Sequence, residues 1–157
     1  MKETAESFMR RASALALQSV SQGGGPFGAL IVCDGRIVAE GVNLVTSACD
    51  ATAHAEIVAI REACRAERRF HLTGYEIYSS CEPCPMCLGA IYWARLDRLF
   101  FAATRADAAQ AGFSDAQIYA ELAAPLRARR LPMEQLLREE ALHAFDAWKS
   151  KVDRIDY

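Results

Sequence analysis

The sequence contains no long hydrophobic run. No uninterrupted apolar stretch approaches the roughly 18 residues that would indicate a membrane-spanning helix. The first six residues include two acids, Glu3 and Glu6, and lead into an amphipathic stretch, which is not the pattern of a secretory signal. We therefore expect a cytoplasmic protein that makes no contact with membranes.

An excess of basic residues is also missing. The chain has 18 Lys and Arg residues against 20 Asp and Glu residues, which gives a net charge of −2. Proteins that bind a phosphate backbone usually present a basic stripe, because neutralising phosphates drives that binding. The densest basic run, residues 127–130, is more simply explained as a solvated surface. Nucleic acid is therefore not expected to be the main partner.

Disulfide bonds are not expected, although the chain has six cysteines. A chain of 157 residues that is 52% hydrophobic can bury a core without a disulfide framework, and it shows no export signal. Three cysteines fall close together, at Cys81, Cys84 and Cys87, and this crowding calls for a chemical explanation. The others fit small core or near-surface positions: Cys33, Cys49 and Cys64.

The order of hydrophobic patterns predicts an α/β fold. Helical spacing alternates with short apolar runs typical of strands, and Asp34-Gly35 is a hairpin turn signal. This alternation favours a three-layer α/β/α sandwich with a mixed central sheet, and no repeat or linker divides residues 1–157, so we expect one domain. The expected helices cover 5–20, 54–67, the stretch after Pro85, 114–122 and the carboxyl end; the expected strands cover 27–32, 36–40, 75–79 and 98–102; residues 132–139 fit either state.

Two short motifs carry the ligands of a metal site. His54-Ala55-Glu56 opens one expected helix, and Pro83-Cys84-Pro85-Met86-Cys87 opens another. Residues at i and i+3 share a helix face, so Cys84 and Cys87 can bind one ion, and the first turn of a helix favours thiolates. A catalytic zinc takes three protein ligands and keeps one position for water. We therefore predict one Zn²⁺ per chain, bound by His54, Cys84 and Cys87.

Glu56 is placed close to the predicted metal without being a ligand. A carboxylate there can take a proton from zinc-bound water and pass it to a substrate nitrogen, which leaves a tetrahedral carbon that expels ammonia. H-x-E followed by P-C-x-x-C is the signature of zinc-dependent nucleobase deaminases. Its parts alone are less specific, since C-x-x-C also occurs in redox pairs and metal half-sites. An iron–sulfur site would need a fourth cysteine near position 91, which is Ile91.

The whole chain also resembles a known family. Gly25-Pro26-Phe27-Gly28-Ala29, the two metal motifs, Ala111-Gly112-Phe113-Ser114-Asp115 and the end of the chain from Phe145 to Tyr157 are similar to the short bacterial guanine deaminases of the cytidine deaminase-like superfamily. The metal motif marks the superfamily, whereas the Gly-Phe-x-Asp segment and the terminal tyrosine favour guanine. The resemblance implies hydrolysis of guanine to xanthine and ammonia.

The same resemblance implies a substrate pocket and a homodimer. Asn43 would hydrogen-bond the purine, and Asp115 would bind a ring or amino nitrogen and assist proton transfer. In this family the carboxyl-terminal segment is exchanged between subunits, so Tyr157 would close the partner's pocket. Without the resemblance, Asp115 would be a helix cap and Tyr157 a frayed end. The residues expected to bind substrate are Phe27, Asn43, Ala55, Trp93, Asp115 and Tyr157.

Three other functions stay open at this point. A tRNA adenosine deaminase shares the metal and the glutamate, but would be expected to have a basic surface. Deaminases of cytosine, guanosine or an aminotriazine differ only in the shape of the pocket. A structural-zinc interaction module would need a fourth protein ligand and leaves Glu56 without a role.

Overall fold

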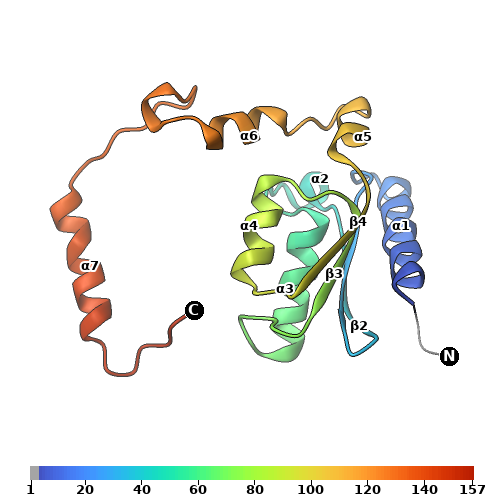
Figure 1. Cartoon of the computed structure of the whole chain (residues 1–157), viewed down its shortest axis with the longest axis horizontal. Helices are drawn as coiled ribbons and strands as arrows, with labels where there is room; N and C mark the ends of the chain where they lie inside the picture. Colours follow the sequence, from blue (N-terminus) through green and yellow to red (C-terminus); the bar gives the residue numbers. More distant parts are fainter. Residues whose placement is uncertain (1–3) are drawn as a thin grey trace. The chain divides into compact units, whose positions relative to one another are not determined.

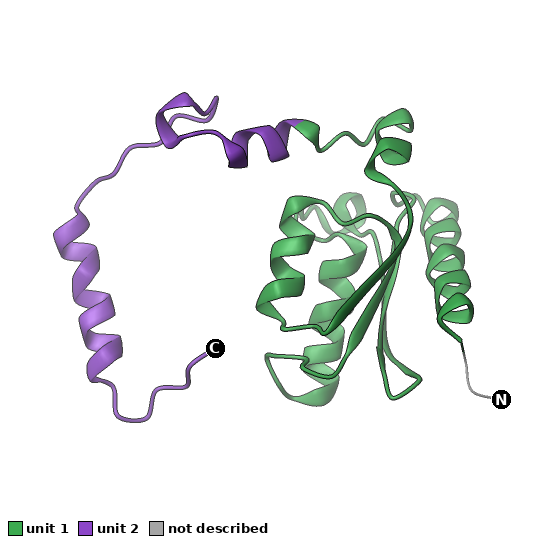
Figure 2. Cartoon of the chain, viewed as in Figure 1, with its two compact units in different colours: residues 1–116 green, residues 117–157 purple. Residues whose placement is uncertain are grey.

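The computed structural model describes residues 4–157. The chain divides into two compact units, residues 1–116 and residues 117–157 (Figure 2). The prediction that residues 1–157 form one domain stays a prediction. No described helix combines the length and the hydropathy needed to cross a membrane.

The first unit is built on a mixed four-stranded sheet. Its strands lie in the order β2-β1-β3-β4. The β1–β2 and β1–β3 pairs are antiparallel, and the β3–β4 pair is parallel. Asp34 and Gly35 form the β1–β2 hairpin turn with positive φ values, as the sequence predicts. The strands are β1 (Gly28–Cys33), β2 (Arg36–Val42), β3 (Glu76–Cys81) and β4 (Arg98–Ala103).

Helices cover both faces of this sheet, which confirms the predicted three-layer α/β/α sandwich (Figure 1). Helix α1 (Ala5–Ser21) packs on one face through Phe8, Ala12 and Leu15. Helices α3 (Ala55–Glu67) and α4 (Pro85–Trp93) lie on the other face, over a core that includes Ile31 and Ile77. The two inner strands, β1 and β3, are thus largely buried, as expected for strands that read as apolar runs.

A glycine on β2 sets how closely α3 approaches the sheet. A Cβ atom added to Gly41 would lie 2.2 Å from the carbonyl oxygen of Ala55 and 2.6 Å from the amide nitrogen of Ala59. Both atoms belong to the first turns of α3, so only a residue without a side chain lets the helix backbone sit at this distance. Since His54 and Glu56 start this helix, Gly41 also fixes the height of their side chains above the sheet.

Several elements differ from the sequence-based expectation. Helices α2 (Val45–Ala48) and α5 (Arg105–Gln110) and the 3-10 turn η1 (Leu126–Ala128) were not predicted, because each is too short to show a period. Residues 132–137 form neither helix nor strand, so both options for 132–139 are wrong except where α7 begins at Arg138.

The second unit contains most of α6 (Ala116–Ala123) and all of α7 (Arg138–Ser150), and both helices were expected. Neither helix has a buried residue. Phe145 on α7 is 60% exposed, and Leu122 on α6 is 58% exposed. An amphipathic helix normally buries its apolar face against other residues. Among the described residues, the apolar faces of α6 and α7 are not buried in this way.

The close approach at Gly41 gives a test of the fold. We expect Gly41→Ala to lower the free energy of unfolding by about 1–3 kcal/mol, because the new methyl group overlaps the backbone of α3. The control is Gly89→Ala in α4, where an added Cβ meets nothing within 4 Å and alanine favours the helix. Urea unfolding followed by circular dichroism measures both, and equal stabilities for the two variants would contradict the role given to Gly41.

Candidate active site

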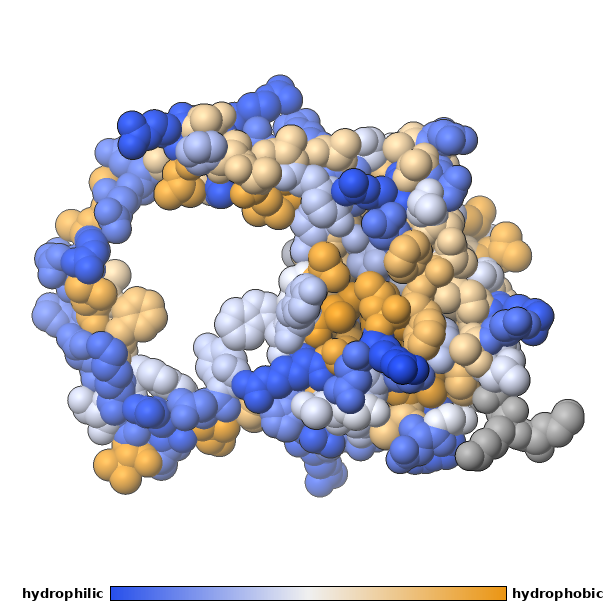
Figure 3. Space-filling model, in the orientation of Figure 1, coloured by the Kyte–Doolittle hydropathy of each residue, from blue (hydrophilic) through white to orange (hydrophobic). Residues whose placement is uncertain are grey.

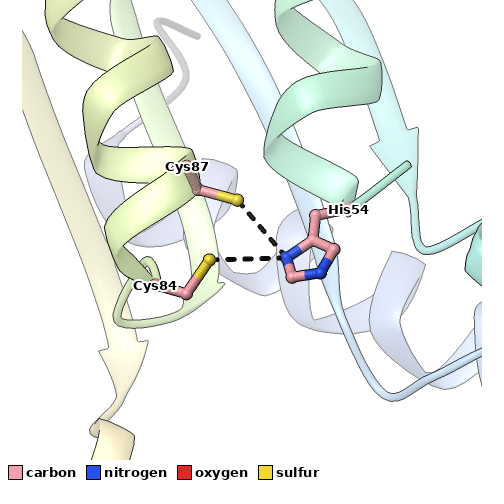
Figure 4. Close-up of side chains that lie close together, drawn as sticks. All are labelled: His54, Cys84 and Cys87. Atoms are coloured by element: carbon pink, nitrogen blue, oxygen red, sulfur yellow. Dashed lines mark hydrogen bonds between the residues drawn. The ribbon is translucent and has the colours of Figure 1, made fainter. Parts of the chain in front are cut away.

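The metal motif is assembled from the starts of two helices. His54 is the residue that precedes α3, and Cys84 is the residue that precedes α4. Pro85 occupies the first turn of α4, where its missing N–H group costs no hydrogen bond. Cys87 follows one turn later and is fully buried. Figure 4 shows the three side chains pointing toward one another from the two helices.

The spacing of these three side chains matches a zinc ion. His54 Nδ1 lies 3.6 Å from Cys84 Sγ and 3.5 Å from Cys87 Sγ. A tetrahedral ion with Zn–S near 2.3 Å and Zn–N near 2.0 Å separates its nitrogen and sulfur ligands by about 3.5 Å. All three ligand atoms lie within 4.8 Å of one another. The donor set and its geometry therefore fit one zinc ion without rearrangement.

The number of ligands distinguishes a catalytic site from a structural one. Among residues 4–157, no fourth His, Cys, Asp or Glu joins the group of His54, Cys84 and Cys87. Structural zinc sites use four protein ligands, whereas catalytic ones keep a position for water or substrate. The three-ligand group therefore favours a catalytic site over a structural-zinc interaction module.

The two cysteine thiols differ in how readily they lose a proton. The pKa of Cys84 is lowered to about 4, first because the Cys87 thiol hydrogen-bonds its sulfur and also because the His54 ring does so, against the effect of burial. The same bond to Cys84, together with burial, raises the pKa of Cys87. The hydrogen bond to Cys84 raises the pKa of His54. Cys84 is thus the cysteine that ionises more readily, and binding of a metal as thiolates requires Cys87 to lose its proton as well.

Glu56 lies inside the protein beside this triad. Its side chain is buried, with 6% of the residue exposed, and burial raises the pKa of its carboxyl group. Oε2 accepts a hydrogen bond from Cys87 Sγ at 3.5 Å, and Oε1 accepts one from Ser79 Oγ at 3.3 Å. Oε2 therefore faces the metal ligands, while Oε1 is bound to the sheet.

Three of the expected substrate-binding residues are connected to the triad along the chain or through backbone hydrogen bonds. Ala55 is the first residue of α3 and is fully buried. Asn43 follows β2, is buried, and is joined to Phe27 by a backbone hydrogen bond of 3.3 Å. The next residue after Asn43, Leu44, donates its amide to the carbonyl of Ala53, beside His54. Asn43 and Phe27 are thereby tied to the loop that carries the histidine ligand.

The other expected residues are placed differently. Asp115 is half-buried just before α6, and the neighbouring Phe113 packs edge-on against Phe27 with ring centroids 5.1 Å apart. Trp93 ends α4 six residues beyond Cys87, which corresponds to about 9 Å of helix, so the structure does not bring it to the triad. Tyr157 is 73% exposed and lies near Trp148. Their substrate-binding roles stay predictions.

Ser79 is a site residue that the sequence motifs do not include. Its hydroxyl is buried and contacts the glutamate, but the residue was assigned only to a strand. One signal was available, because a polar residue two positions after the inward-facing Ile77 stands on the same side of the strand. Cys81, by contrast, lies outside the triad and is a buried residue at the end of β3.

Comparison with known proteins assigns the family. The family model described as the cytidine and deoxycytidylate deaminase zinc-binding region matches residues 2–103. The chain belongs to this deaminase family. The match includes the triad and Glu56, so the enzyme is a zinc-dependent aminohydrolase. Asp115 and Tyr157 lie beyond the matched residues.

Relatives of this deaminase fall into two groups by coverage. It is 50% identical to the guanine deaminase of Bacillus subtilis over 97% of this chain and 98% of that one. The crystal structure of that guanine deaminase superposes with a TM-score of 0.96 at 49% identity, covering 99% of both chains. The tRNA-specific adenosine deaminase of Aquifex aeolicus is 40% identical over only 62% of this chain and 65% of its own length.

Metal content tests the ligand assignment. We expect the purified deaminase to hold one zinc per chain, and Cys84→Ser or Cys87→Ser to hold close to none, because each removes a soft ligand from a three-ligand site. Cys49→Ser is the control, since Cys49 is exposed and outside the triad. Elemental analysis by mass spectrometry measures the zinc. Full occupancy in either triad variant, or iron in the parent protein, would contradict the assignment.

Proposed function

We propose that this deaminase hydrolyses guanine to xanthine and ammonia. The observation that carries the proposal is the three-ligand site with a buried carboxylate, Glu56, beside it. The substrate follows from the likeness to a guanine deaminase, which extends over 97% of the chain and so includes sequence beyond the family's zinc-binding region. The net reaction consumes one water, and the amine-bearing ring carbon of guanine exchanges nitrogen for oxygen.

Glu56 moves the protons in this proposal. A zinc ion held by the triad would polarise a water molecule and make it a nucleophile near neutral pH. Oε2 of Glu56 faces the triad and would take the proton from that water. The same oxygen would then deliver the proton to the substrate nitrogen, so that ammonia leaves. Burial raises the pKa of the carboxyl group, which suits a group that must both accept and release a proton.

Asn43 and Phe27 would hold the purine. Asn43 Oδ1 accepts a hydrogen bond from the amide of Val45 at 3.2 Å. With its oxygen engaged in this way, the side chain would offer its amide nitrogen, a donor, to an acceptor on the purine. Phe27 and Phe113 form an aromatic pair at the same end of the sheet, and Ala55 leaves room beside the metal ligands. Asp115, which follows this pair, would bind a ring or amino nitrogen of guanine.

A homodimer that exchanges carboxyl-terminal segments completes the proposal. Strand β4 lies at one edge of the sheet, and its Phe101 is 45% exposed. Hydrophobic side chains gather over β4 and α4 (Figure 3). Trp93 and Tyr92 on α4 are 71% and 77% exposed, and the helices of the second unit bury none of their residues. A second copy of the chain would cover these surfaces, and its Tyr157 would close the pocket.

The rival substrate, adenosine in tRNA, has less support. The tRNA-specific relative covers 62% of this chain, and the net charge of −2 offers no general attraction for RNA.

We place the enzyme in the cytoplasm. All six cysteines are free thiols, which is compatible with that reducing compartment.

A substrate panel tests the proposed reaction. We expect ammonia release from guanine, and far less from guanosine, cytosine, adenine and tRNA. Glu56→Gln should retain one zinc per chain and lose kcat by about 10²–10⁴-fold, because the amide cannot accept the proton. Strong activity on another amine with none on guanine would refute the substrate, and loss of zinc from Glu56→Gln would refute the proton-transfer role.

Mixing two inactive variants tests the exchange of Tyr157. A variant that lacks Tyr157 and the variant Glu56→Gln are unfolded together and refolded as mixed dimers. If Tyr157 serves the partner's pocket, one site of each mixed dimer has an intact Glu56 and receives Tyr157 from the other chain. Activity should then rise well above the sum of the two variants. No recovery, with mixed dimers verified by mass spectrometry, would mean that Tyr157 acts in its own chain or not at all.

A further inference from the structure

Ser79 is a polar residue at an inward position of the central sheet. It lies on β3 between the partners Ala29 on β1 and Phe101 on β4, and only 2% of the residue is exposed. Side chains alternate along a strand, so Ser79 shares its face with Ile77, which packs in the core beneath α3 and α4. An apolar residue would pack here without cost, whereas a buried hydroxyl needs a hydrogen-bond partner.

The partner of that hydroxyl is the carboxylate of Glu56. Ser79 Oγ donates to Oε1 at 3.3 Å, while Cys87 Sγ donates to Oε2 at 3.5 Å. The two oxygens therefore have separate surroundings, because one is bound to the sheet and the other faces the metal ligands. No buried side-chain oxygen or nitrogen among residues 4–157 lacks a hydrogen bond.

When zinc is bound, only one of these two side chains can still donate a hydrogen bond to Glu56. A cysteine binds zinc as a thiolate, so Cys87 then has no proton to donate to Glu56. Ser79 keeps its proton, because a serine hydroxyl does not ionise in this range. The serine is then the side-chain donor that the structure provides to orient the carboxylate.

We propose that Ser79 is a positioning residue that holds Oε1 of Glu56 against β3 and thereby keeps Oε2 directed at the metal site. This inference rests on the proposed function, since it concerns the carboxylate that moves the protons. A carboxylate without this bond rotates about its last side-chain bond, and a misdirected base slows proton transfer without changing how the purine binds. The effect therefore falls on kcat and not on KM.

Two sets of variants separate the effect of the Ser79 hydroxyl group on kcat from the effect of side-chain packing. We expect Ser79→Ala to lower kcat on the order of tenfold with KM nearly unchanged, as is typical when an outer partner of a catalytic group is lost. Ser79→Thr and Ser79→Val differ only by a hydroxyl in place of a methyl group, so Thr should retain much more of kcat than Val. The control is Tyr78→Phe, which removes the hydroxyl bonded to Glu76 on the opposite face and should leave kcat at the parent value.

A measurement without turnover tests the same bond. The ¹³C chemical shift of the Glu56 carboxyl carbon, assigned by its absence from Glu56→Gln, should move in Ser79→Ala and stay in place in Tyr78→Phe. Zinc content should remain one per chain in all of these variants. An unchanged shift, equal kcat values for Thr and Val, or loss of zinc from Ser79→Ala would overturn the proposal. If the parent enzyme does not act on guanine, the proposed substrate fails, while the chemical shift still decides the role of Ser79.

Discussion

The first turns of α3 and α4 must meet closely enough for one ion to touch both. His54 Nδ1 lies 3.5–3.6 Å from the sulfurs of Cys84 and Cys87, so a displacement of either helix by about one ångström would remove a ligand from zinc's preferred distance. Gly41 lets α3 approach the sheet to backbone contact, and β3 leads into Cys84 within three residues of its end. The packing of the helices on the sheet therefore fixes the geometry of the metal ligands.

The same arrangement buries a carboxylate beside the metal ligands. Glu56 follows His54 by two residues, so the close approach that positions the ligand also buries the acid. Burial raises its pKa, and its two oxygens are divided between the metal ligands and the sheet. A group with this environment can exchange a proton with two partners in succession, which is what hydrolytic removal of an amine requires.

The sequence predicted the parts of this site that depend on short spacings. His54 and Glu56 are two residues apart, and Cys84 and Cys87 are one helical turn apart, so motif and periodicity together identify them. The sandwich followed from the alternation of helix and strand patterns. Contacts between distant segments were not predictable in this way, and Ser79 reaches Glu56 across 23 residues of chain. Trp93 was expected at the substrate only from the family resemblance, and it lies at the end of α4 remote from Cys84.

X-ray absorption at the zinc edge of the loaded protein examines the ligand set itself. The structure predicts two sulfur scatterers at about 2.3 Å and lighter nitrogen or oxygen scatterers at about 2.0–2.1 Å, with one position not filled by the protein. Three or four sulfurs would require Cys81 or another cysteine as a ligand. That result would close the open position and contradict hydrolytic chemistry at this centre.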